Sequence, residues 1–277
     1  MTEFDEYGAY ESLSVDTDDH RWAFGTGFGD PLAGVDTAVP GDVDGAALAA
    51  QCLALGDDAL IYSHRLQQWV TRAPELEEET ALANIALDLL GQARMLLTRA
   101  GQAEGRGRDE DRLAFFRDER EFRNVRLVER ADADFAELAG RLFVFSAWRL
   151  AAFQALRTTR DPVLAAIAAK AVKELTYHRD YAAGWVIRLG DGTDLSHAKM
   201  QAALDTLWPL VAELDLSQEA DAVLDTVFAT ATLTRPAAAP VGPVAGKTGR
   251  DGMHTEAMGY ILAELQSVAR AHPDATW

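Results

Sequence analysis

The sequence has very little of several things, and each shortage excludes a class of protein. Its 277 residues include one cysteine, Cys52, which excludes an internal disulfide framework and favours a reducing compartment. No apolar run approaches the roughly 20 residues that a membrane-spanning helix needs, so we expect no membrane association. The first six residues are acidic and do not resemble a secretory signal, which supports a cytoplasmic location.

Basic charge is also scarce. The chain has 26 Lys and Arg against 44 Asp and Glu, a net charge of −18. Nucleic-acid complexes need clusters of basic side chains on the phosphates, so we expect no nucleic-acid binding. The first 50 residues hold 11 acids and one base, Arg21, which leaves −8 for the remainder. Residues 1–44, rich in Asp and Gly, predict a flexible, disordered acidic tail ahead of a domain at 45–277.

The alternating apolar and polar residues typical of strands are missing, whereas helical spacing recurs from residue 45 onward. Leu82, Ile85 and Leu89, for example, follow one another at three- and four-residue steps. This pattern predicts an all-α protein, an up-down helical bundle with additional helices. The predicted helices cover residues 46–72, 74–103, 132–158, 161–189, 193–214 (interrupted near Pro209), 217–231 and 254–271.

Two of these helices carry incomplete versions of a di-iron motif. A carboxylate-bridged di-iron bundle needs Glu-x-x-His on each of two helices, because positions i and i+3 share one helix face. Here those positions hold Leu89 and Gln92 in one helix and Leu175 and His178 in the other. The helix at 132–158 also lacks the Glu that such a site takes from it after its first turn. We therefore predict no metal site and no catalytic residue in this chain.

Polar side chains on the same helices have two interpretations. Asp88 lies on the first helix, and Glu174 and His178 lie at i and i+4 on the second. They could form a metal or proton-transfer site, or a buried polar network that fills the space of the missing metals. The network is favoured, because a metal site needs three or four ligands from several helices. Asp57 and Asp58 are expected to be solvated surface acids, with a relic metal ligand as the alternative.

Several segments together resemble the PaaC family, whose members are subunits of the ring 1,2-phenylacetyl-CoA epoxidases, over about residues 53–277. The segments are Leu55–Asp58, Trp69–Glu77, Ala83–Arg94, Phe116–Arg120, Ala169–Glu174 with Tyr177-His178, Arg188–Thr193 and Gly252–Glu256. The resemblance implies a ferritin-like bundle in a heteromeric monooxygenase. Such an enzyme uses O₂ and electrons from NADPH, delivered by a separate reductase, to epoxidise the aromatic ring of phenylacetyl-CoA.

The resemblance also implies that the di-iron centre lies in a related catalytic subunit and that this chain holds no cofactor. Carried over to this sequence, the ligand pattern leaves only His178. The chain would then be a structural, non-catalytic subunit that packs against and stabilises the catalytic one. Lys247 and Arg250 are candidate contacts for a coenzyme A phosphate on the assembled complex. Two alternatives stay open: a di-iron oxidase active in its own right, and a helical interaction module outside this pathway.

Overall fold

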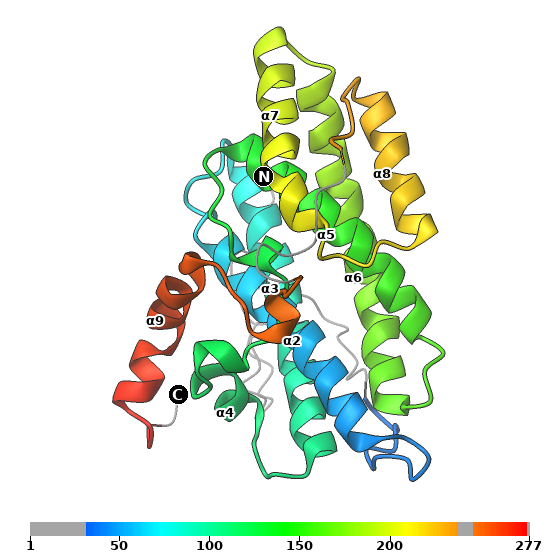
Figure 1. The fold of residues 1–277 in the computed structure, drawn as a ribbon, viewed down its shortest axis with the longest axis vertical. Coiled ribbons are helices and arrows are strands. Elements are labelled where there is room, and N and C mark those ends of the chain that lie inside the picture. Colours follow the sequence, from blue (N-terminus) through cyan, green and yellow to red (C-terminus); the bar gives the residue numbers. More distant parts are fainter. Residues whose placement is uncertain (1–31, 238–245, 276–277) are drawn as a thin grey trace, which may run out of the picture.

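A computed structural model describes residues 32–237 and 246–275, and within these ranges the regular structure is helical, without a strand (Figure 1). Residues 1–31 of the predicted tail lie outside the described part. The α-helices are α2 (Gly45–Gln67), α3 (Leu76–Glu104), α4 (Glu110–Phe115), α5 (Phe135–Leu156), α6 (Pro162–Gly190), α7 (Asp194–Val211), α8 (Gln218–Thr230) and α9 (Glu256–Ala271). Three short 3-10 helices are η1 (Glu119–Glu121), η2 (Arg126–Glu129) and η3 (Gly249–Asp251). None of the described helices combines the length and the hydropathy that crossing a bilayer requires.

Four long helices form the centre of the fold. Helix α2 packs along α3, and α5 packs along α6, each pair joined by a short loop, and α3 also contacts α6. A long connection, residues 105–134, carries the chain from α3 to α5 through α4, η1 and η2. One long crossover of this kind is found in ferritin-like bundles. The all-α helical bundle predicted from the sequence is confirmed.

Aspartates at the helix starts help to place these helices. Asp44 accepts hydrogen bonds from two backbone N–H groups of α2, and Asp134 does the same for α5. Asp161 accepts one from Leu164 N, and Pro162 begins α6. A side-chain oxygen at this position satisfies N–H groups that have no partner inside the helix. Proline costs little there, because its missing N–H would be unpaired anyway.

The additional helices lie on opposite sides of the bundle. Helices α7 and α8 pack on α5 and α6, while α9 packs against α4, η1 and η2 (Figure 1). Helix α7 continues past Pro209 to Val211, so the predicted interruption there is wrong. Because Pro209 lies in the last turn, it removes a hydrogen bond only where the helix is already ending.

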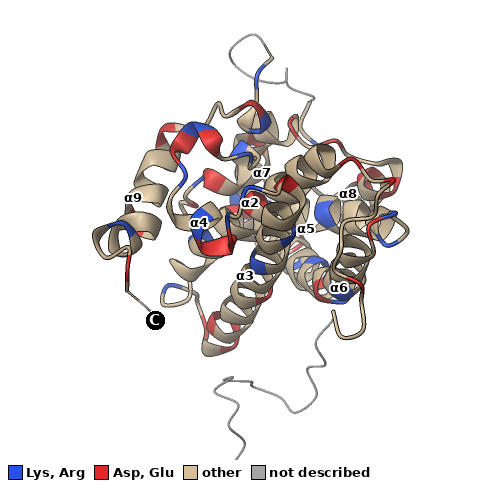
Figure 2. Ribbon diagram, turned by 90° about the horizontal axis from the view of Figure 1, so that it is seen from below, with Lys and Arg blue, Asp and Glu red and all other residues tan. Residues whose placement is uncertain are grey.

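The core contains charged side chains as well as apolar ones. Arg99, Arg141 and Arg149 are among the largest side chains that are fully buried, and basic positions are visible on the central helices in Figure 2. Arg99 pairs with Asp161 and also donates to the backbone oxygens of Thr37 and Ala38. Buried cations persist only where carboxylates and carbonyls compensate them. Arg99 therefore ties residues that precede α2 to the bundle.

Candidate functional site

The four positions of the incomplete di-iron motif lie inside the bundle. Leu89 and Gln92 on α3, and Leu175 and His178 on α6, are all buried. The two leucines have no donor atom for a metal. Among the residues that the structure describes, no group of three or more His, Cys, Asp or Glu is arranged to hold a metal ion. The residues present here therefore do not fit a di-iron centre.

A guanidinium lies beside these positions. Arg149 on α5 donates from Nε to Gln92 Oε1 at 3.1 Å and from Nη1 to the backbone oxygen of Leu55 at 3.1 Å. Gln92 in turn donates from Nε2 to Glu174 Oε2 at 2.9 Å, and Lys170 donates to the other oxygen of Glu174. We call Arg149, Gln92, Glu174 and Lys170 the bundle-centre network. It connects all four long helices through hydrogen bonds.

The guanidinium of Arg149 keeps its positive charge at neutral pH although it is buried. Burial lowers the pKa of Arg149 to about 10, while the charge of Asp58 acts in the opposite direction. A guanidinium with that pKa is still protonated near pH 7. Lys170 is paired with Glu174, and Asp58 lies 4.0 Å from Arg149 Nη1 and offsets part of its charge. A buried cation beside the four positions of the incomplete motif disfavours the binding of a metal ion there.

Asp88 and His178 form a separate pair. His178 Nε2 lies 2.9 Å from Asp88 Oδ2, and the imidazole is buried while the aspartate is 36% exposed. The two residues join α3 to α6, one turn from the Gln92–Glu174 bond. The structure thus brings Asp88 to His178 and Glu174 to Gln92, and no side-chain hydrogen bond joins the two pairs. The imidazole of His178 has one side-chain hydrogen-bond partner among the described residues, which is Asp88. No third His, Cys, Asp or Glu in the described residues joins this pair to form a possible metal site.

Asp57 and Asp58 are fully buried, so the prediction that they are solvated surface acids is wrong. Arg117 forms a two-pronged ion pair with Asp57, which also accepts from Arg123 N at 2.8 Å. Asp58 accepts from Arg250 Nη1 and Nη2 at 3.0 and 2.8 Å. The partners come from segments 60 to 192 residues away. Only the folding of those distant segments onto α2 buries these two acids.

Lys247 and Arg250 have different environments. Arg250 binds Asp58 and also donates to the backbone oxygens of Ala54 and Arg123, at 2.9 and 2.6 Å. Arg250 therefore joins η3 to α2 through hydrogen bonds and an ion pair. Lys247 is exposed, and no carboxylate in the described part of the chain pairs with it. A contact between either residue and a coenzyme A phosphate stays a prediction.

Glu129 anchors the loop that carries Arg250. His254 Nδ1 lies 2.7 Å from Glu129 Oε1, and its Nε2 lies 3.2 Å from Phe122 O. Thr255 donates its N–H and its hydroxyl to the other oxygen of Glu129, both at 2.7 Å. Both imidazole nitrogens face acceptors, so both must donate, as only the protonated ring does. Burial alone would lower the pKa of His254, but the hydrogen bond and charge of Glu129 outweigh it and raise that pKa above 6.5.

We expect this pair to make stability depend on pH. Since the folded-state pKa of His254 is raised, its contribution is complete below about pH 6.5 and is lost as pH rises through the folded-state pKa. His254→Gln should lower the free energy of unfolding by about 1–3 kcal/mol at acidic pH and by less at alkaline pH. Urea unfolding across this range measures the difference. His272→Gln, an exposed control, should show no such trend, and a pH-independent cost for His254→Gln would contradict the charged pair.

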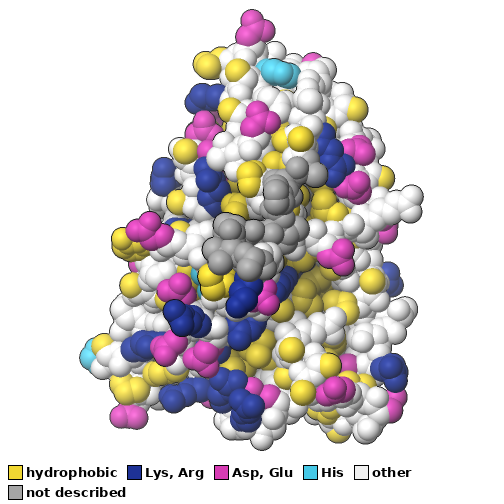
Figure 3. All heavy atoms as spheres, viewed as in Figure 1, with side chains coloured by type: hydrophobic (Ala, Val, Ile, Leu, Met, Phe, Trp, Pro, Cys, Tyr) yellow, Lys and Arg dark blue, Asp and Glu magenta, His cyan; other side chains and the backbone are white. Residues whose placement is uncertain are grey.

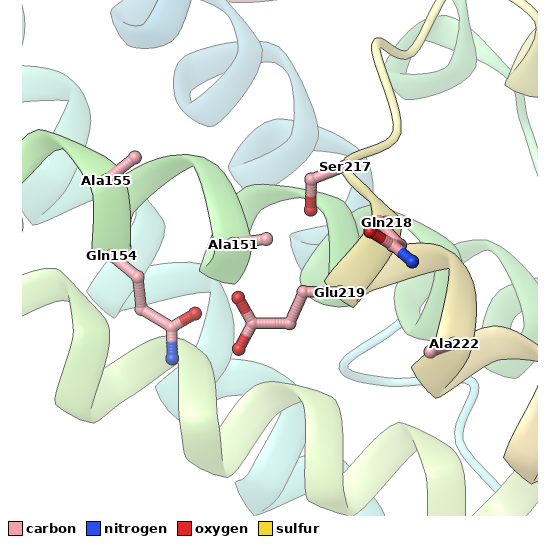
Figure 4. Close-up of a pocket in the computed structure, with 7 residues that line it drawn as sticks. All are labelled: Ala151, Gln154, Ala155, Ser217, Gln218, Glu219 and Ala222. Atoms are coloured by element: carbon pink, nitrogen blue, oxygen red, sulfur yellow. The ribbon is translucent and has the colours of Figure 1, made fainter.

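A cavity between α5 and α8 offers little chemistry. It has a volume of about 710 Å³ and is lined by Ala151, Gln154 and Ala155 from α5, by Gln218, Glu219 and Ala222 from α8, and by Ser217, which precedes α8. Glu219 and Gln154 face one another across it (Figure 4). Ser217 is occupied as the cap of α8, where it accepts from Ala220 N at 3.2 Å. One carboxylate without a base, nucleophile or metal partner does not make a catalytic site.

Reasoning from the sequence missed Arg149, the residue at the middle of the bundle-centre network. The available signal is its position as a lone charge in the apolar run Leu142–Phe153. A charge in such a run must find partners when the helix is buried. The ion pairs of Asp57 and Asp58 gave no comparable signal, because their partners are distant in the sequence.

Comparison with known proteins bears on the family of this chain. A family model described as "Phenylacetic acid catabolic protein" matches residues 34–225 and 213–277. A protein of Escherichia coli (strain K12), named as one of the subunits of 1,2-phenylacetyl-CoA epoxidase, is 45% identical over 246 residues. The match covers 83% of this chain and 99% of that protein. The resemblance predicted from the sequence is confirmed: this chain belongs to the phenylacetic acid catabolic protein family.

Proposed function

We propose that this chain is a structural, non-catalytic subunit of a multicomponent phenylacetyl-CoA 1,2-epoxidase. The observation that carries the proposal is the bundle-centre network, in which Arg149 and Gln92 stand beside leucines where a di-iron bundle needs carboxylates and histidines. The similarity to the epoxidase subunit of Escherichia coli supports the assignment to this enzyme. The di-iron centre, and with it the oxygen chemistry, then belongs to a partner subunit.

The proposed role is to pack against that catalytic subunit and to stabilise it. Apolar side chains on α3 and α6 support such a contact, since Leu87 is 60% exposed and Tyr177 is 51% exposed. Each lies next in sequence to a member of the Asp88–His178 pair that joins the two helices. Gly91 and Gly184 on the same helices have open space where a side chain would be, so another chain can approach the backbone closely. A reductase partner, phenylacetyl-CoA as the substrate of the complex and a cytoplasmic location are further parts of the proposal.

The metal content of the purified protein tests this proposal. We expect far less than one iron per chain when it is produced alone in iron-rich medium, and about two irons per complex when it is co-produced with its catalytic partner. Elemental analysis after gel filtration measures both. Stoichiometric iron in the isolated chain would instead indicate a di-iron oxidase active in its own right. Failure to co-purify with any oxygenase component would favour an interaction module outside the pathway.

A pair of surface variants tests whether the exposed apolar side chain of Leu87 contacts the catalytic subunit. Leu87→Asp should abolish or weaken co-purification, because it places a charge among apolar side chains that the partner would cover. Leu195→Asp on α7 is the matched control, since Leu195 is 68% exposed and lies on a helix outside the four central ones. Equal co-purification of both variants would remove Leu87 from the interface.

A further inference from the structure

An arginine-lined pocket opens on the surface of this acidic protein. Its volume is about 470 Å³, within the range of small-molecule sites. In the view of Figure 3, which is that of Figure 1, Lys and Arg side chains gather at the lower left of the molecule, near α4. The charged residues that line the pocket are Arg106, Arg108, Arg117, Glu121, Arg123 and Arg250. Five guanidinium groups around one cavity are unexpected in a chain of net charge −18.

Three of these arginines have carboxylate partners. Arg117 pairs with Asp57, and Arg250 pairs with Asp58. Arg108 donates to both oxygens of Glu104, at 2.7 and 2.6 Å. Asp58 must also compensate Arg149, whose Nη1 lies 4.0 Å away, so its negative charge is shared between two guanidinium groups. These ion pairs fix the walls of the pocket without making it negative.

The other two arginines form no ion pair. Within the described residues, no carboxylate lies within 4.0 Å of the guanidinium groups of Arg106 and Arg123. Arg123 uses Nη1 to donate to the backbone oxygens of Arg120 and Phe122, both at 2.7 Å, which leaves its Nε and Nη2 without a partner in that part of the chain. Glu121, the one acid of the lining, accepts from Asp118 N at 2.9 Å. The pocket therefore keeps an excess of positive charge and free N–H donors.

The remaining wall is apolar. Ala50, Leu53 and Ala54 from α2 form it. An inorganic anion alone would need no such surface, whereas a nucleotide carries the flat face of an aromatic base and sugar carbons beside its phosphates. Guanidinium groups match phosphate oxygens in a two-pronged geometry, and they do so best in a concave site that excludes some water. We propose that this pocket binds the phosphate groups of a nucleotide-sized ligand.

This inference goes beyond the proposed function, because a scaffold subunit needs no ligand of its own. Isothermal titration calorimetry on the full chain at low salt tests it with adenosine diphosphate, pyrophosphate and adenosine. We expect adenosine diphosphate to bind, pyrophosphate to bind more weakly and adenosine not to bind, with affinity falling as salt rises. Equal binding of pyrophosphate and adenosine diphosphate would show that the base and sugar contribute nothing, so that the pocket takes an inorganic polyphosphate anion, and would overturn the nucleotide part of the proposal. Absence of binding, or equal binding of adenosine, would overturn it entirely.

Two variants separate the pocket from non-specific attraction. Arg106→Gln removes a guanidinium that makes no hydrogen bond or ion pair in the described structure, so the fold should be unaffected. Arg123→Gln removes the other guanidinium without a carboxylate partner, together with its hydrogen bonds to the backbone oxygens of Arg120 and Phe122. Together they should weaken binding of adenosine diphosphate about tenfold or more. Arg160→Gln is the matched control, since that side chain is 77% exposed and lies on the loop between α5 and α6. Equal weakening by the control would show that the attraction is not specific to the pocket. If only a peptide rich in acidic residues bound, the pocket would be a protein contact and the proposal would fail.

Discussion

Replacing Arg149 by methionine is expected to lower the free energy of unfolding by about 3–5 kcal/mol. The change leaves Gln92 Oε1 buried without a donor, takes one of two donors from the backbone oxygen of Leu55, and removes a charge that both Asp58 and Glu174 stabilise. Each unsatisfied buried acceptor costs about 1–3 kcal/mol. Urea or guanidinium unfolding followed by circular dichroism measures the loss.

The partner residue provides a second test of the same network. Combining Arg149→Met with Gln92→Met replaces both members of one hydrogen bond, so the double variant should be more stable than the sum of the single effects predicts. Arg160→Met, an exposed substitution, should change stability by no more than about 0.5 kcal/mol. A loss of the same small size at Arg149 would mean that the bundle-centre network contributes little to stability.

Replacing Asp58 by alanine is expected to be similarly costly, about 3–5 kcal/mol, and to loosen the loop around η3. Without the carboxylate, Arg250 and Arg149 lose their shared counter-charge and Val125 N loses its acceptor at 2.9 Å. Arg250 is then held to α2 by one backbone oxygen, that of Ala54. Trypsin should therefore cleave after Lys247 and Arg250 faster than in the unaltered chain, under conditions in which both proteins remain folded.

The control for Asp58 is an exposed aspartate. Asp42 is 68% exposed and lies 3.7 Å from Arg160, so Asp42→Ala should leave both stability and cleavage rate nearly unchanged. If the Asp58 variant had a lower free energy of unfolding but was not cleaved faster by trypsin, the Glu129–His254 contact, rather than Asp58, would hold the loop. The two results together assign the stability of this loop to one carboxylate or the other.

Much of the candidate site could be predicted because its decisive feature is local. The i, i+3 spacing shows from sequence alone that Leu89 and Gln92 share a helix face, and likewise Leu175 and His178. Leucine cannot bind a metal in any fold, so the loss of ligands needed no coordinates. The helix boundaries followed from Pro, Gly and Asp near the ends, with α7 continuing through Pro209 as an exception. There the packing of the last turn on the bundle outweighed the intrinsic preference of proline.

Charge pairing, in contrast, could not be predicted. Asp57 and Asp58 look like surface acids in the sequence, because nothing near them suggests a cation. Their partners, Arg117 and Arg250, come from the crossover and from η3. The same applies to Glu129 and His254, which lie 125 residues apart. Such pairs depend on which segments meet in space, and helical periodicity carries no information about that.

The sequence by itself thus determined the helical class, the family and the replacement of both motif glutamates by Leu89 and Leu175, since each depends on residue identity and short spacing. Only the tertiary structure decided what replaces the ligands and where positive charge gathers. Burial of an arginine is tolerable only if distant chain segments supply its partners. That is why the place of Arg149 in the bundle centre, and the pocket formed by Arg106 and Arg123, emerge only when the four central helices and the crossover are assembled.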